Sequence, residues 1–101
     1  MDFMASQQDK GNDKGIDELC QDLGHLQDEQ EIKAFFTDLC TPAELKSMSE
    51  RWRVAKHLAT GESYRSINER TGVSTTTITR VARAMTYGMN GYRLLLDKLK
   101  G

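Results

Sequence analysis

The chain is 101 residues long, carries a formal net charge of −1 at pH 7 and is 38% hydrophobic. This length allows one domain at most beside a tail, and no apolar run is long enough for a signal peptide or a membrane span. Two cysteines are too few for a disulfide scaffold, and they do not form close ligand pairs with the two His residues. We therefore expect a cytoplasmic protein with no metal site and no membrane partner.

Charge divides the chain into an acidic first part and a basic second part. Residues 1–40 carry three Lys against ten Asp or Glu, giving −7, whereas residues 41–101 carry eleven Lys or Arg against five acids, giving +6. A polyanion responds to the local field of a protein rather than to its net charge. The second part of the chain is therefore the candidate for binding nucleic acid.

The pattern before residue 41 predicts a tail followed by two helices. Residues 1–13 are polar and lack an apolar period, so we expect a disordered tail there. Apolar residues recur at helical spacing over 16–26 and again over 32–39, the most apolar stripe of the chain. With the later patterns, they predict a single all-α domain over residues 14–101. A domain this short makes a thin core, so we expect it to bury apolar surface against a second copy.

The next segment begins with a helix start signal. Residues 41–44, Thr-Pro-Ala-Glu, form a capping box with Pro at the first helical position, which predicts a helix starting at Pro42. Ser49 could cap a separate following helix that Gly61 would end. The inner face of that helix would be formed by Trp52, Ala55, Leu58 and Ala59.

Residues 63–85 predict two short helices joined at Gly72. Tyr64, Ile67 and Thr71 fall on one face of the first helix, and Gly72 is the residue best able to take the positive φ of a sharp turn. Ser74 would cap the second helix. Two helices joined by a turn that contains Gly are typical of a helix-turn-helix.

The second of these helices presents two different faces. Ile78, Val81, Ala82 and Met85 form the stripe that we expect to be buried. Taking about 100° per residue, the side chains that point away from it are Thr76, Arg80 and Arg83. Residues 74–77 are four consecutive hydroxyl residues, which are poor helix formers, so helix stability does not explain them. Arg forks match guanine or phosphate, and Thr methyl groups can meet thymine. The alternative interpretation is an ordinary helical hairpin with a solvated face.

The end of the chain predicts one more helix. Residues 86–92, TYGMNGY, contain two Gly and an Asn and indicate a loop. The residues that follow place Leu95, Leu96 and Leu99 on a short closing helix.

From Leu39 to Lys100 the chain resembles the tryptophan repressor family of bacterial regulators. The segments that carry this resemblance are CTPAELKSMSERWRVAKHLATGE, SYRSINERTG and STTTITR. Within that family the chain is similar to the tryptophan-repressor-like branch whose effector is not known. The resemblance implies an all-helical, intertwined homodimer, whose two helix-turn-helix units would enter successive major grooves.

The resemblance also implies which residues act. It places DNA contacts on Arg65, Asn68, Thr75, Thr76, Thr77, Thr79 and Arg80, to which the pattern of the second helix adds Ser74 and Arg83. It places the two Arg of an indole-carboxylate pocket on Arg51 and Arg80, with Val81 where the family has Gly. Either a smaller acid occupies this pocket or Val81 fills it; we favour the second, and expect no cofactor and no response to tryptophan.

Two functions from different classes follow. We favour a sequence-specific, double-stranded DNA-binding transcriptional regulator, a repressor that acts as a homodimer. The alternative is a helical protein–protein adaptor whose Arg-rich face binds an acidic partner. An enzyme is not expected, because no Ser–His–Asp, Cys–His or paired-carboxylate arrangement can be placed in one pocket.

Overall fold

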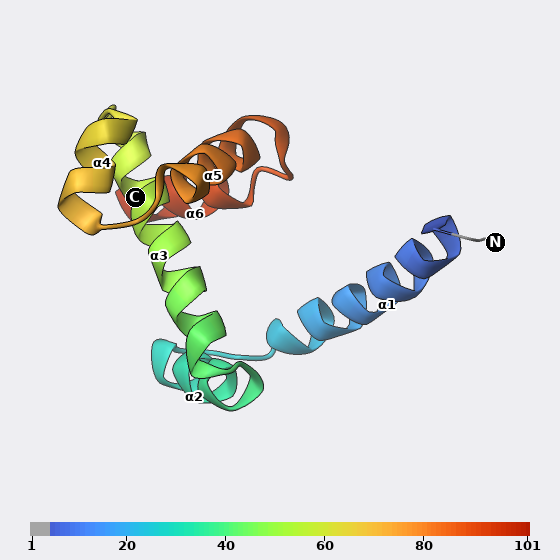
Figure 1. The fold of residues 1–101 in the computed structure, drawn as a ribbon. Coiled ribbons are helices and arrows are strands. Elements are labelled where there is room, and N and C mark those ends of the chain that lie inside the picture. The colour runs from blue at the N-terminus through green and yellow to red at the C-terminus, as the bar shows by residue number, and fades with distance from the viewer. Residues whose placement is uncertain (1–4) are drawn as a thin grey trace. The chain divides into compact units, whose positions relative to one another are not determined.

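The computed structural model describes the backbone of residues 5–101 and the side chains of residues 13–101. Over that range the chain is all-α, as predicted, and contains no strand (Figure 1). The helices are α1 (Ala5–Leu23), α2 (Glu29–Leu39), α3 (Pro42–Ala59), α4 (Tyr64–Thr71), α5 (Thr75–Tyr87) and α6 (Gly91–Lys100). Among the helices described, none is both long and apolar enough to cross a membrane.

The chain divides into two compact units, and the single domain over residues 14–101 stays a prediction. Unit 1 is Met1–Leu39 and unit 2 is Cys40–Gly101, so the acidic and the basic parts of the chain fall in different units. No side chain described in unit 1 is fully buried, and Ile32, Phe35 and Leu39 of α2 are 45%, 36% and 50% exposed. Two helices of this length offer too little surface to cover their own apolar stripes, which explains why a separate core forms only in unit 2.

Helix α1 starts earlier than the sequence predicted. A disordered tail was expected over residues 1–13, but α1 begins at Ala5; residues 1–4 lie outside the described part. Gln and Lys have good helix propensity, and α1 runs without a break into the apolar pattern that begins at Ile16. The structure thus places a helix over residues 5–13, where the sequence predicted a tail.

Helix α3 is one continuous helix. Its start is the capping box that the sequence predicted: Glu44 N–H donates to Thr41 Oγ1 (3.1 Å) and Thr41 N–H donates to Glu44 Oε1 (2.8 Å). The prediction of a second start at Ser49 is wrong. The Ser49 hydroxyl donates to the Leu45 carbonyl oxygen one turn back (2.8 Å), so it is satisfied inside the helix and does not cap a new one.

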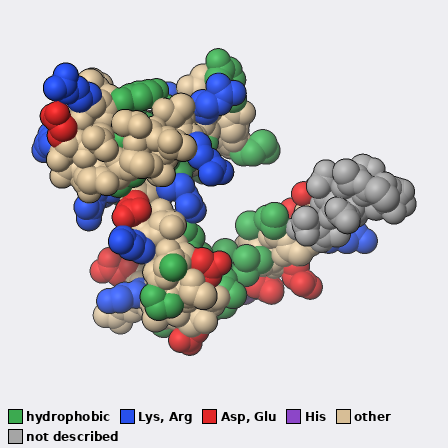
Figure 2. Space-filling model, in the orientation of Figure 1, with side chains coloured by type: hydrophobic (Ala, Val, Ile, Leu, Met, Phe, Trp, Pro, Cys, Tyr) green, Lys and Arg blue, Asp and Glu red, His purple; other side chains and the backbone are tan. Residues whose placement is uncertain are grey.

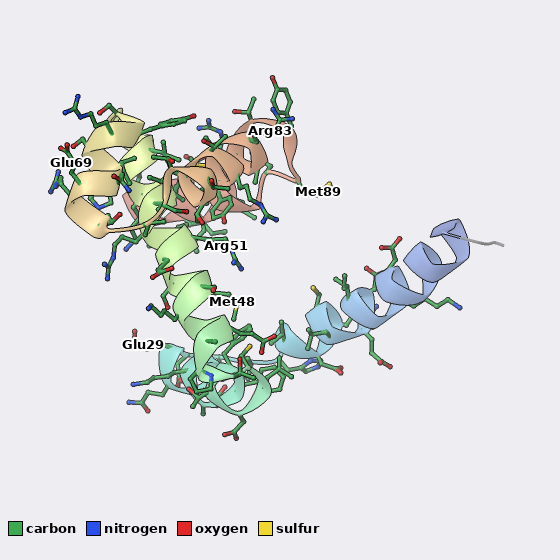
Figure 3. The ribbon with its side chains drawn as sticks, viewed as in Figure 1. Glu29, Met48, Arg51, Glu69, Arg83 and Met89 are labelled. Carbon is green, nitrogen blue, oxygen red and sulfur yellow. The ribbon has the colours of Figure 1, made fainter. Side chains whose placement is uncertain are left out.

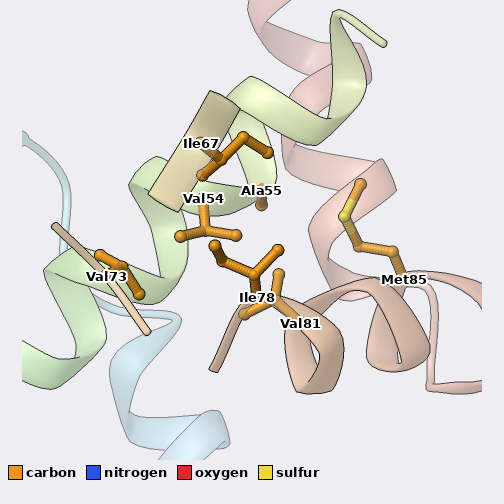
Figure 4. Packing of buried hydrophobic residues seen from close by; sticks show 7 residues of the cluster. All are labelled: Val54, Ala55, Ile67, Val73, Ile78, Val81 and Met85. Atoms are coloured by element: carbon orange, nitrogen blue, oxygen red, sulfur yellow. The ribbon is translucent and has the colours of Figure 1, made fainter. Parts of the chain in front are cut away.

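The core of unit 2 joins α3, α4 and α5 (Figure 4). Its buried members are Val54, Ala55, Ile67, Val73, Ile78, Val81 and Met85. Trp52, Leu58, Tyr92 and Leu96 are partly buried against it. The inner face predicted for α3 is therefore shifted: Val54 is fully buried, while Ala59 is exposed. Helix α3 packs against α4, α5 and α6, so more than one of its faces is covered.

The link between α3 and α4 is built around the carboxylate of Glu62. His57 Nδ1 lies 2.7 Å from Glu62 Oε1, while Ser66 Oγ (2.8 Å) and Arg70 Nη1 (3.2 Å) donate to Glu62 Oε2. The Glu62 side chain is only 13% exposed. Hydrogen bonds from His57 and Ser66, with help from the Arg70 charge, hold the pKa of Glu62 below its ordinary value of 4.5, against the opposing effect of desolvation.

Stability should therefore fall in acid through Glu62. Because its pKa is lower in the folded chain than in the unfolded chain, the stabilisation is complete above the unfolded value of about 4.5 and is lost as the pH falls through the folded value. Urea unfolding of the wild type and Glu62→Gln from pH 3 to 7 measures this directly. The difference in free energy of unfolding should be constant above about pH 5.5 and shrink below pH 4. A difference independent of pH would show that the carboxylate contributes nothing through its charge.

Candidate nucleic-acid interface

The turn between α4 and α5 has the geometry that the sequence predicted. Gly72 ends α4 with φ 76°, in the left-handed region, and its N–H donates to the Asn68 carbonyl oxygen (2.9 Å). Ser74 caps α5, since its Oγ accepts from the N–H of Thr77. Between them, Val73 turns its side chain into the core and is 5% exposed. The two helices therefore form a helix-turn-helix with Val73 as its internal anchor.

The Val73 peptide groups are held by side chains from α4. Val73 N–H donates to Thr71 Oγ1 (3.1 Å), and Asn68 Nδ2 donates to the Val73 carbonyl oxygen (2.8 Å). Thr71 in turn donates its hydroxyl to the Ile67 carbonyl oxygen (2.6 Å). Asn68, which the sequence resemblance placed among the DNA contacts, thus has its amide group engaged inside the turn. We call Asn68 and Thr71 the turn clamp.

Helix α5 has one polar and one apolar face. Ile78, Val81 and Met85 are buried, as the sequence predicted, whereas Ala82, the fourth residue of the predicted stripe, is half-buried. Four exposed side chains repeat at i, i+3, i+4 and i+7 on the other side, namely Thr76, Thr79, Arg80 and Arg83. The exposed Thr75 lies one residue before them, in the first turn of the helix. We call the four repeating residues the polar stripe of α5. It combines hydroxyl, methyl and guanidinium groups, which are the groups that read base edges in a major groove.

Two of the four consecutive hydroxyl residues have structural roles. Thr77 N–H donates to Ser74 Oγ (3.2 Å), and the Ser74 hydroxyl donates to Thr77 Oγ1 (3.1 Å). Thr77 is also half-buried. The cap therefore explains Ser74 and Thr77, both of which the sequence placed among the DNA contacts. Ser74, Thr75 and Thr76 are exposed, so a structural role for Ser74 leaves it able to face a ligand as well.

Arg83 of the polar stripe and Arg65 of α4 have weak partners inside the chain. The Arg83 guanidinium lies 5.5 Å from the centre of the Tyr87 ring, and that ring is 78% exposed. Arg65 Nε lies 3.2 Å from Glu69 Oε2, and these side chains are 89% and 62% exposed. Exposed pairs of this kind contribute about 0–1 kcal/mol, so both arginines can exchange their partner for a phosphate. Figure 2 shows Lys and Arg side chains distributed over the visible face of unit 2.

The three residues expected to form an effector pocket do lie together. A cavity of about 290 Å³ is lined by Arg51 of α3 and by Arg80 and Val81 of α5. Figure 3 labels Arg51 on α3. The remaining lining residues are Thr77, Ala84 and Tyr92. Val81 is 1% exposed and belongs to the core.

Sequence reasoning missed Tyr92 as a wall of this cavity. Its ring stacks on Trp52, with ring centres 6.3 Å apart and planes 7° from parallel. The spacing could have indicated this, because Tyr92 lies four residues before Leu96, on the same face of the last helix, and both residues pack against the core.

Known proteins similar to this chain share both its sequence and its fold. A family model described as Trp repressor protein matches residues 14–100. The uncharacterized protein YerC of Bacillus subtilis (strain 168) is 42% identical over 92 residues, which are 91% of this chain and 88% of that protein. The crystal structure of a TrpR like protein from Eubacterium eligens ATCC 27750 has a TM-score of 0.79 and 40% identity, covering 86% of this chain and 90% of that chain. A candidate Trp repressor from Staphylococcus aureus has the same TM-score and 38% identity, covering 86% and 87%.

Proposed function

This chain belongs to the Trp repressor family, and we propose that it is a homodimeric, sequence-specific DNA-binding repressor of transcription that needs no cofactor. The observation that carries the proposal is the polar stripe of α5, presented by the second helix of a helix-turn-helix on the basic unit. An exposed Arg can bind guanine with two hydrogen bonds, and Thr can contact a thymine methyl group. These groups lie at one helical spacing, so a single face can reach successive bases.

The contacts divide by their expected role. Thr76, Thr79 and Arg80 of the polar stripe would read base edges, and Thr75 extends that surface. Arg65 lies on α4, the helix that crosses the backbone in this kind of docking, so we assign it to a phosphate. Arg83, stacked near Tyr87 at the far end of α5, fits a second phosphate contact.

Exposed apolar surface supports the homodimer. Leu94, Leu95 and Leu99 of α6 are 56%, 46% and 62% exposed, and α2 contains no buried residue. A stable chain rarely leaves so much apolar surface in water without a partner. Sedimentation equilibrium at micromolar protein should give a dimer, whereas a stable monomer of 11.4 kDa would contradict the proposal.

Selection from a random duplex pool tests DNA recognition directly. The pure protein should enrich one sequence with internal two-fold symmetry, since a symmetric dimer reads two half-sites. Affinity for that sequence should survive competitor DNA and fall steeply as salt rises. Weak binding to all duplexes alike, together with capture of an acidic protein partner, would instead favour the helical adaptor.

Tryptophan should have no effect on this protein. Val81 stands where the resemblance places Gly in the family, and it lines the cavity beside Arg51 and Arg80. Its two added methyl groups would take space that an indole needs, and close-packed sites resist added bulk by about 1–3 kcal/mol. L-tryptophan at millimolar concentration should therefore leave both the melting temperature and the DNA affinity unchanged. Calorimetry that shows micromolar tryptophan binding together with tighter DNA binding would contradict this. Binding of a small carboxylic acid, but not tryptophan, would show that the cavity beside Arg51 and Arg80 accepts a smaller effector.

A further inference from the structure

We propose that Glu62 is a positioning residue of the helix-turn-helix: its carboxylate fixes the angle of α4, and through the turn clamp that of α5, against α3. The proposal rests on DNA binding as the function, because the angle matters only if α5 must reach into a groove. It concerns a residue in the link between α3 and α4 rather than on the polar stripe of α5.

The Glu62 carboxylate contacts three side chains that belong to two different helices. His57 lies in the last turn of α3, whereas Ser66 and Arg70 lie in the first and last turns of α4. All three approach the Glu62 carboxylate, at 2.7, 2.8 and 3.2 Å, and that side chain is 13% exposed. Hydrogen bonds to an ionised and largely shielded acceptor are stronger than those between neutral groups. The carboxylate therefore ties the first turn of α4 to the end of α3, with a weaker contact to the last turn through Arg70, whose side chain is 65% exposed.

Helix α4 needs such a tie because its packing is slight. It has eight residues, and Ile67 is the one buried residue described in it. A helix this short is not stable alone, so the direction of its axis depends on its contacts with α3 and α5. Glu62 supplies a second attachment, which fixes the direction of the α4 axis. Asn68 and Thr71 then pass that direction to the start of α5 through the Val73 peptide groups.

Whether neutralising Glu62 weakens or tightens DNA binding distinguishes a positioning role from a simple effect of its charge. A carboxylate beside a DNA-binding unit repels phosphates, so its removal should tighten DNA binding if charge alone mattered. Glu69, which lies on α4 itself, provides the matched comparison for Glu62 (Figure 3). Glu69 is 62% exposed and contacts Arg65, which is itself 89% exposed. Neutralising either residue changes the net charge equally, but only Glu62 connects α4 to α3.

The experiment compares Glu62→Gln with Glu69→Gln in the full-length protein, using the duplex selected by the wild type and an unrelated duplex of the same length. Glu62→Gln should weaken binding to the selected duplex about tenfold, since an amide cannot accept all three hydrogen bonds, and leave binding to the unrelated duplex unchanged or tighter. Glu69→Gln should bind both duplexes as tightly as the wild type or more tightly. If Glu62→Gln behaves like Glu69→Gln, Glu62 has no positioning role.

Hydrogen exchange on the free protein tests the same idea without DNA. In Glu62→Gln the amides of α4 should lose protection about tenfold, while those of α3 and α6 keep theirs. This experiment separates the positioning role of Glu62 from the proposed DNA binding. If Glu62→Gln loses protection in α4 but the wild type selects no DNA sequence, DNA binding is contradicted and the positioning of α4 is not. Equal loss of protection in all helices would mean that Glu62 supports the whole fold, which overturns the proposal. Ser66→Ala removes one hydrogen bond to Glu62 without changing the charge. Its affinity for the selected duplex should fall by less than that of Glu62→Gln, and its affinity for the unrelated duplex should not change. An unchanged affinity for the selected duplex would also count against the positioning role.

Discussion

Replacing Arg80 with Ala should lower the preference for the selected duplex over unrelated DNA by about 5- to 150-fold, because a bidentate base contact contributes about 1–3 kcal/mol of discrimination. Arg80 is exposed at the centre of the polar stripe, so its removal leaves no cavity in the core and the helical fold should remain intact. Thr76→Ala should also reduce the preference, since it removes both a hydroxyl and a methyl group from the same face. Competition binding with circular dichroism on the same samples measures both effects.

Arg65→Ala is the matched control. Its side chain is 89% exposed on α4 and its proposed contact is a phosphate, so affinity should fall for all duplexes alike. The slope of log affinity against log salt should become less steep by about one, the change expected for one phosphate contact. If Arg80→Ala keeps the wild-type preference while Arg65→Ala loses it, the assignment of α5 as the reading helix is wrong.

Replacing Ile67 with Ala should lower the free energy of unfolding by about 2–5 kcal/mol, as for other fully buried large-to-small changes. Ile67 is 0% exposed and is the buried residue through which α4 contacts the core. The missing methyl and methylene groups would leave a cavity between α3, α4 and α5 that the helices cannot close without shifting. Urea unfolding followed by far-ultraviolet circular dichroism measures the change.

Tyr64→Ala provides the comparison on the same helix. The sequence placed Tyr64, Ile67 and Thr71 on one face, yet Tyr64 is 44% exposed. Its truncation should therefore change the free energy of unfolding by less than about 1 kcal/mol. Similar losses for Tyr64→Ala and Ile67→Ala would contradict the burial seen in unit 2.

The features that the sequence predicted correctly are those determined by neighbouring residues. The capping box at Thr41, the left-handed Gly72 and the cap at Ser74 each depend on groups within a few positions along the chain. The family resemblance is borne out by the match over residues 14–100, which reflects the same local signals in an unbroken order.

The features that were missed depend on contacts between helices. Val54 is buried because α3 is covered by several helices at once, which no single amphipathic stripe indicates. A polar side chain in a sequence does not reveal whether it faces a ligand or a backbone group. Asn68 and Thr77 were placed among the DNA contacts, and the sequence did not indicate that their side chains also hold the turn and the start of α5. Glu62 was not singled out, since its three partners come together only when α4 folds against α3.

The turn clamp has a consequence for the kinetics of recognition. The Val73 peptide groups are held on both sides within the free chain, so we expect the turn to be ordered before any partner arrives. Binding should then proceed as the docking of a rigid element, with an association rate limited by diffusion and raised by the positive field of unit 2. Differences between DNA sequences would appear in how long each complex lasts rather than in how quickly it forms.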